Sequence, residues 1–378
     1  MYLWGRKIPL YGIDTKAYIN QAMGAEELLL QTIGGDTYRC SLFALGISPY
    51  MTAAILVQVY TAIRKAGSGS RISPFRTNRL IVLWTTGLAI LQAVLHVKEL
   101  YFQVAGGDLL LARGIAVLEM VTGVLVILWL SERNKKFGIG GQTALIFVNI
   151  LDGIIASVGK HSLGELILPF VISCGMILVI VEMENTEFRI PLQRISIHNI
   201  YADKNYLAIK MNPIGTMPVM FSTAFFMIPQ VIVYGLSLLF PKNGTILWWR
   251  EGLNLKNPLG IGIYILIIYV LTMLFAMLFI NPRDLTEQFL KSGDCLLNIR
   301  AGKETRRYLF RKIFWISFAS ATVMSLCLGI PLYFQYKGNL EGTLVMLPSS
   351  VMLLAGMWCN LYRECLAVKS LDSYEKFI

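Results

Sequence analysis

Apolar stretches long enough to enter a bilayer alternate with short polar segments along the whole chain. A helix needs about 20 apolar residues to cross the hydrocarbon core. Nine such stretches lie at about 40–62, 80–97, 110–131, 140–156, 164–183, 214–240, 259–281, 313–335 and 343–362. Residues 1–12 are too few to span and resemble the outer end of a truncated first helix. The pattern predicts an all-α polytopic membrane protein with about nine full spans and a first-helix stub.

The first full stretch contains residues that a plain lipid anchor rarely needs. It holds Gly46, Pro49 and Gln58, together with several hydroxyl side chains. Proline frees a backbone carbonyl one turn earlier, so we expect Pro49 to kink this helix. A break of that kind is tolerated at membrane depth only where protein or water covers it. We therefore expect this helix to line an interior path.

The stretch at 140–156 is unusual in a different way. It is short, weakly apolar and rich in glycine, and it contains Asn149 and Asp152. A helix that faces lipid would not be built in this way, so we place it inside the bundle beside a cavity. Helical spacing puts Ile146 and Ile150 one turn apart on one face.

Composition supports the membrane assignment. The chain is 55% hydrophobic and 15% charged, whereas soluble domains carry about 25% charged residues. The formal net charge of +11 is explained more simply by the positive-inside rule than by nucleic-acid binding. About two-thirds of the Lys and Arg residues fall in alternate segments, at 64–79, 132–138, 184–213, 282–312 and from 363 onward. This bias places those segments and the C-terminus in the cytoplasm.

Two of the segments on that side are long and charged. Residues 184–213 and 282–312 are both net basic. Such segments are either simply solvated or form a docking platform for a soluble partner. Because two of them lie on one side of the membrane, the docking interpretation is favoured.

Candidate chemistry is sparse. The sequence has no Walker A loop, HExxH or GxSxG motif, and its six cysteines form no CxxC pair. We therefore expect no enzymatic activity, no metal and no cofactor. Glu119, midway along one span, is the exception, because an ionisable group at that depth suggests function by default. It either makes a structural hydrogen bond or serves a proton-coupled small-solute transporter, so transporter and polypeptide channel both remain open.

Sequence motifs narrow this choice. Residues 43–50 read Phe-Ala-Leu-Gly-Ile-Ser-Pro-Tyr, which closely resembles the second transmembrane helix of the SecY family. Further matches follow in family order at 8–14, 128–140, 189–191, 212–218, 281–293 and 299–309. The chain is identified as a member of the SecY family, the central subunit of the protein-conducting channel. Residues 187–199 and the short total length are most similar to the accessory SecY of Gram-positive bacteria, with the housekeeping subunit as the alternative.

The resemblance implies an architecture and a pore. The fold would be a SecY-like helical bundle with a pseudo-two-fold inverted repeat, its halves being residues 1–157 and 158–378. A ring of apolar side chains would close the pore, and by motif position its members are Ile47, Met51, Ile146, Ile150, Met220 and Leu353. A plug around residues 25–33 would seal the outer funnel, with Glu27, Leu28, Leu29 and Leu30 at its centre.

The resemblance also implies partners. In the cell membrane, a passive gated pore of this kind would be driven by an accessory SecA-type ATPase and would export serine-rich glycosylated adhesins. A SecE-like small membrane subunit, other accessory Sec proteins, the secreted preprotein and membrane lipid are further expected partners, and the ribosome is a less favoured one. Arg189, Arg300, Arg306 and Arg307 would contact the cytosolic partner.

Overall fold

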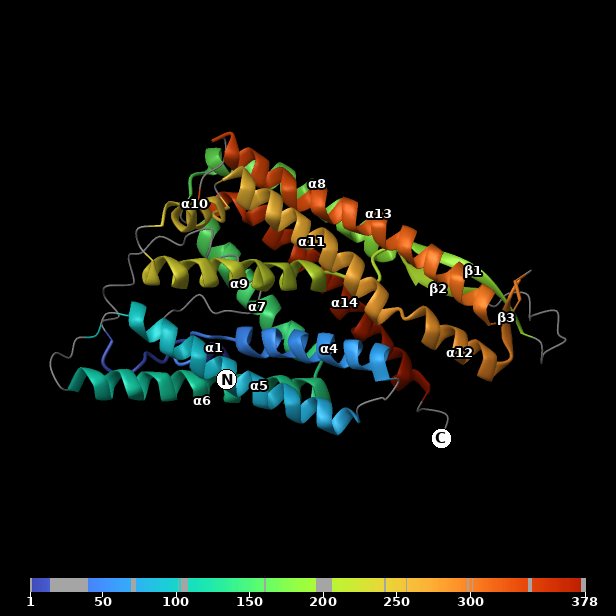
Figure 1. Cartoon of the computed structure of the whole chain (residues 1–378), viewed down its shortest axis with the longest axis horizontal. Coiled ribbons are helices and arrows are strands. Elements are labelled where there is room, and N and C mark those ends of the chain that lie inside the picture. The colour runs from blue at the N-terminus through green and yellow to red at the C-terminus, as the bar shows by residue number, and fades with distance from the viewer. Residues whose placement is uncertain are drawn as a thin grey trace. The chain divides into compact units, whose positions relative to one another are not determined.

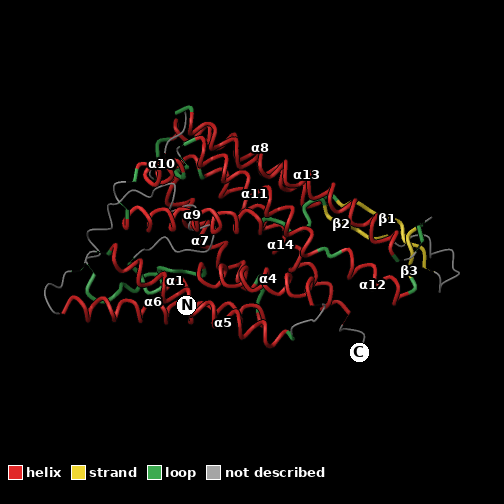
Figure 2. Tube along the Cα trace, in the orientation of Figure 1, coloured by secondary structure: helices red, strands yellow, loops and turns green. Residues whose placement is uncertain are grey.

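The described residues of the chain form two compact units. The computed structural model describes residues 2–13, 40–68, 73–100, 102, 108–159, 161–194, 206–240, 243–255, 257–297, 299–300, 302–338 and 342–374. The first unit contains Met1–Phe170 and Glu341–Ile378, and the second contains Val171–Leu340. Figure 1 labels the elements of both units, and Figure 2 shows that helices dominate each of them. The division into repeat halves at 157/158 stays a prediction.

The first unit is a helical assembly. Its elements are α1 (Tyr2–Gly5), α4 (Ser48–Ser68), α5 (Pro74–Glu99), α6 (Asp108–Phe137), α7 (Gly141–Val158), the start of α8 (Leu163–Asn185), the 3-10 turn η2 (Gly342–Val345) and α14 (Leu347–Tyr374). Helix α4 packs against α5, α5 against α6, α6 against α7, and α7 against α14. Small residues at Ala89, Ala93 and Ala116 are almost fully buried in the core between α5 and α6. Such residues let membrane helices approach closely.

The second unit combines helices with a small sheet. Its elements are the rest of α8, β1 (Glu187–Arg194), β2 (Tyr206–Lys210), α9 (Met217–Leu239), α10 (Gly244–Gly252), α11 (Pro258–Phe279), α12 (Pro282–Ser292), β3 (Asp294–Leu296) and α13 (Lys303–Tyr336). Helix α11 packs against both α9 and α13. Strand β1 is central and antiparallel to both neighbours, in the order β2-β1-β3.

The long helices match the predicted spans. Seven are long and apolar enough to cross a membrane: Phe75–Lys98, Asp108–Phe137, Gly141–Val158, Gly164–Asn185, Pro258–Ser292, Lys303–Tyr336 and Leu347–Ser370. Helices α4 and α9, of 21 and 23 residues, fall on the two remaining predicted stretches. The hydropathy pattern therefore located every long helix that the structure describes.

The predicted kink at Pro49 is wrong. The helix does not begin near residue 40, because residues 42–47 form turns and α4 starts only at Ser48. Pro49 is therefore in the first turn, where its missing N–H would lack a helical acceptor in any case. Gly46 supports the preceding turn with a left-handed φ of 56°. Proline starts this helix and does not break it.

The sheet is a finding that the sequence analysis did not include. Strands β1 and β2 come from the charged segment 184–213, and β3 comes from 282–312. Their inward side chains pack on the start of α13. The cluster consists of Ile190, Ile209, Leu296, Leu309 and Ile313, each at most 4% exposed. These two segments therefore form one folded surface, which we call the platform: β1, β2, β3 and the first turns of α13.

Candidate functional site

The turn before α4 positions Ile47 and Met51, which are 2% and 4% exposed. On one side the Leu42 N–H donates to the Ile8 carbonyl oxygen at 3.0 Å. On the other side Gly123 of α6 lies directly against Leu42, and a Cβ on Gly123 would be only 2.1 Å from the Leu42 carbonyl oxygen. The turn is therefore fixed between the N-terminal segment and α6.

Helix α7 presents Ile146 and Ile150, each 1% exposed, whereas its Leu151 and Ile155 are 39% and 61% exposed, so only part of this helix is buried. Its polar residues anchor the N-terminal segment. The Tyr2 hydroxyl donates to Asn149 Oδ1 at 2.5 Å. The buried Arg6 pairs with Asp152 at 3.1 Å. The residues that made 140–156 look unsuited to lipid are thus attachment points for the start of the chain.

Leu353 of α14 is fully buried, and α14 packs against α7. Two contacts hold these helices together: the Phe147 and Trp358 rings are 6.0 Å apart, and the Gly140 N–H donates to Glu364 Oε2 at 2.8 Å. The first unit therefore holds five of the six predicted ring positions in buried sites.

The sixth ring position, Met220, is in α9 of the second unit and is 4% exposed. Pro218 lies in the first turn of α9, just as Pro49 lies in the first turn of α4. Closure of the ring across both units stays a prediction. The predicted plug residues Glu27, Leu28, Leu29 and Leu30 lie outside the described residues.

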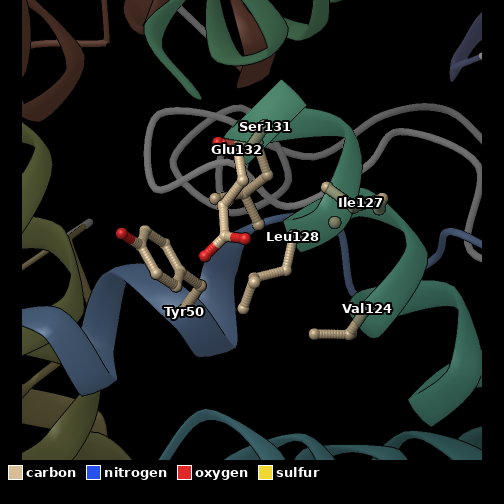
Figure 3. Close-up of a pocket in the computed structure, with 8 residues that line it drawn as sticks. Tyr50, Val124, Ile127, Leu128, Ser131 and Glu132 are labelled. Atoms are coloured by element: carbon tan, nitrogen blue, oxygen red, sulfur yellow. The ribbon is translucent and has the colours of Figure 1, made fainter. Parts of the chain in front are cut away.

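A small hollow adjoins Ile47 in the first unit. Gly46, Ile47 and Tyr50 line one side, and α6 lines the other with Val124, Ile127, Leu128, Ser131 and Glu132. Figure 3 shows the Glu132 carboxylate and the Leu128 side chain extending from α6 toward the start of α4, which carries Tyr50.

Three of the four predicted docking arginines lie on the platform, and Arg300 lies between β3 and α13. Arg189 of β1 has a side chain 63% exposed, and its guanidinium stacks over Tyr206 of β2 at 4.8 Å. The other three, Arg300, Arg306 and Arg307, are also exposed. The Arg300 carbonyl oxygen accepts the Thr305 hydroxyl at 2.9 Å, just before the long helix α13. The platform therefore presents basic groups on a rigid support.

Sequence reasoning missed the aromatic residues between these charges. The Lys312 ammonium lies 5.1 Å from the centre of the Phe188 ring and 5.7 Å from that of Tyr308. Phe188 and Tyr206 are 41% and 48% exposed. The available signal was the recurrence of Phe188, Ile190 and Leu192 at every second position of 187–194, a period that is typical of strands.

Buried polar groups join the platform to the membrane helices. Glu184, at the end of α8, accepts a hydrogen bond from the Asn212 side chain at 3.0 Å. The Asn212 oxygen in turn faces the Ser320 hydroxyl of α13 at 3.5 Å. The Met211 N–H donates to the Thr186 carbonyl oxygen at 2.9 Å beside them. These contacts fasten the segment between β2 and α9 to the end of α8 and to α13.

Glu119 makes a structural contact. Its carboxylate accepts the Tyr11 N–H at 3.0 Å, and its side chain is only partly buried. Of the two roles considered for Glu119, a structural hydrogen bond therefore has a specific partner, the Tyr11 N–H.

Comparisons with known proteins agree with one another. The SecY family model matches residues 41–355. The accessory Sec system protein translocase subunit SecY2 of Streptococcus agalactiae serotype Ia is 31% identical over 94% of this chain and 88% of that protein. The SecY2 subunit of Leuconostoc gelidum subsp. gasicomitatum is 28% identical over 99% of this chain and 93% of that protein.

Solved structures share the fold. A structure described as that of a protein conducting channel matches with a TM-score of 0.70 and 19% identity, over 97% of this chain and 89% of that one. Sec61 in the canine ribosome-channel complex matches with a TM-score of 0.64 and 18% identity, over the same shares of the two chains. At these identities the likeness concerns the arrangement of the helices.

Proposed function

The chain belongs to the SecY family, and from this premise we propose that it is the central subunit of a protein-conducting channel in an accessory Sec system. The observation that carries the proposal is the 31% identity to an accessory SecY2 subunit over nearly the whole of both chains. The seven apolar helices fit a multi-pass protein of the cell membrane.

The throat of the channel is formed by the predicted ring: Ile47, Met51, Ile146, Ile150, Met220 and Leu353. All six side chains are apolar and buried, which supports their assignment. An apolar constriction blocks ions by excluding water. Two of the six are methionines, whose flexible side chains adapt to different neighbours and can yield around an extended polypeptide.

The energy for export comes from a partner in this proposal, and the channel itself carries out no catalysis. An accessory SecA-type ATPase docks on the exposed Arg189, Arg300, Arg306 and Arg307. The exposed basic and aromatic groups of the platform support this contact. The platform and the C-terminus face the cytoplasm, as the distribution of Lys and Arg indicates. A SecE-like subunit, accessory Sec proteins and the preprotein complete the assembly.

A ribosome contact is the less favoured alternative for the platform. Two proteins with similar folds, Sec61 and yeast Ssh1, were solved in complexes with ribosomes. Strong stimulation of export by an ATPase, without ribosome binding, would favour the ATPase as the partner of the platform.

A proton-coupled carrier is the second candidate function, and Glu119→Gln tests it. Glutamine retains the acceptor for the Tyr11 N–H but cannot carry a proton. We expect export to remain close to the parent level. A measurable solute flux in the parent that Glu119→Gln abolishes would favour the carrier.

Gene deletion tests the accessory assignment. We expect the deletion strain to grow normally and to lose one large serine-rich adhesin from its surface. Restoration of that adhesin by the parent gene is the control. Loss of viability would instead identify the housekeeping channel subunit.

A further inference from the structure

Helix α10 is short and exposes an unusual number of large apolar side chains. Its sequence is Gly-Thr-Ile-Leu-Trp-Trp-Arg-Glu-Gly. Leu247, Trp248 and Trp249 are consecutive and 39%, 56% and 49% exposed. The two indoles contact each other edge to face, with centroids 5.5 Å apart. Nine residues thus carry an outward apolar surface that no described part of the second unit covers.

The position of α10 within the second unit is set by the two spans that flank it. Helices α9 and α11 pack against each other and are joined through α10. The sheet precedes α9 and α12 follows α11, so α10 lies at the opposite end of both spans (Figure 1). At 1.5 Å per residue, the 23 and 22 residues of these helices are about 33–35 Å long. That length matches a hydrocarbon core of about 30 Å, which puts α10 at headgroup depth.

Side chains from both spans hold α10 firmly. The Gln230 amide of α9 donates to the Leu253 carbonyl oxygen at 3.0 Å. The Asn257 amide, at the start of α11, donates to the Glu251 carbonyl oxygen. Gly260 allows close approach here, because a Cβ on it would be 2.2 Å from the Asn254 carbonyl oxygen. The tryptophans are therefore displayed on a fixed element and do not belong to a flexible loop.

We propose that α10 is an interfacial helix whose Trp248–Trp249 pair binds the headgroup boundary of the bilayer leaflet opposite the platform. Indole combines a large apolar ring with one N–H donor, so it is most stable where apolar and hydrated regions meet. The consequence rests on the proposed function: the pair fixes the depth of the outer end of α9, the helix that carries Met220.

Depth-dependent fluorescence quenching tests the proposal. The full chain is reconstituted in phosphatidylethanolamine–phosphatidylglycerol vesicles whose lipids carry bromine either next to the headgroup or near the end of the acyl chains. The signal of the pair is the difference between the parent and Trp248→Phe/Trp249→Phe. We expect bromine near the headgroup to remove most of that signal, and bromine at the chain ends to remove much less.

Trp84→Phe is the matched control. Trp84 is 50% exposed near the middle of α5, so its signal should be quenched best by bromine at the chain ends. The proposal is overturned if the pair is quenched at neither depth, which would mean contact with water or a protein partner, or best at the chain ends. Quenching requires no export, so an inactive channel with the expected quenching would count against the proposed function alone.

Discussion

The ring positions of the first unit and the arginines of the platform differ in solvent exposure. Ile146, Ile150 and Leu353 are at most 1% exposed, whereas the side chain of Arg189 is 63% exposed. The role of the ring residues depends on how they pack against their neighbours, and the role of the arginines depends on the charge that they present on the sheet. Substitutions should therefore separate the two regions: changes near the ring should affect folding and gating, and changes of the exposed platform arginines should affect partner binding alone.

The largest effect is expected where the turn before α4 meets α6. In Gly123→Ala the new Cβ would lie 2.1 Å from the Leu42 carbonyl oxygen, so the turn carrying Ile47 must move. We expect a loss of about 1–3 kcal/mol in stability, measured by thermal unfolding in detergent, together with reduced export.

Gly114→Ala is the control for that change. Gly114 lies in the same helix with nothing within 4 Å of its Cβ position, so alanine should be neutral or stabilising by about 1 kcal/mol at most. Equal destabilisation by both variants would contradict the role given to the Gly123–Leu42 contact.

An intermediate effect is expected from charge reversal on the platform. Arg306→Glu/Arg307→Glu should weaken binding of the partner ATPase about tenfold, or about 1.4 kcal/mol. The new carboxylates would repel the partner surface that complements the basic platform. The unfolding temperature should hardly change, since both side chains are exposed. Lys98→Glu, an exposed change at the end of α5, should leave binding intact. Unchanged binding in the double variant would remove these arginines from the docking surface.

The smallest effect is expected from Tyr206→Ala. This change removes the ring under the Arg189 guanidinium, and cation–π contacts at exposed sites contribute about 0.5–1 kcal/mol. We expect faster amide hydrogen exchange in β1 and β2, with exchange in α11 as the internal control. Uniformly faster exchange throughout the second unit would indicate that Tyr206 supports more than the hairpin.

The sequence predicted the membrane helices well for a physical reason. Lipid requires long uninterrupted apolar runs, and those runs are visible without any knowledge of contacts. The burial of Ile146 and Ile150 followed from helical spacing and from the polar residues beside them. The partners of Asn149 and Asp152 could not be predicted, because Tyr2 lies 147 residues before Asn149 and Arg6 lies in the same distant segment.

The errors had equally specific causes. Pro49 inside an apolar run looks like a kink, but the helix begins next to it because Leu42 is held by Ile8 and Gly123. The platform looked like charged loops, since each strand is short and β3 pairs with β1 from a distant segment. The family resemblance supplied the ring, while the alternation in 187–194 was available and unused.

Cross-linking to an arrested secreted chain tests the throat most directly. Single cysteines replace Ile150 and the control Ile155, which is 61% exposed on the same helix, in a background where the six native cysteines are changed to serine. We expect Ile150→Cys to cross-link to the arrested chain in high yield and Ile155→Cys to give only background. Equal yields, or cross-links at Ile155 alone, would contradict a pore formed by these side chains.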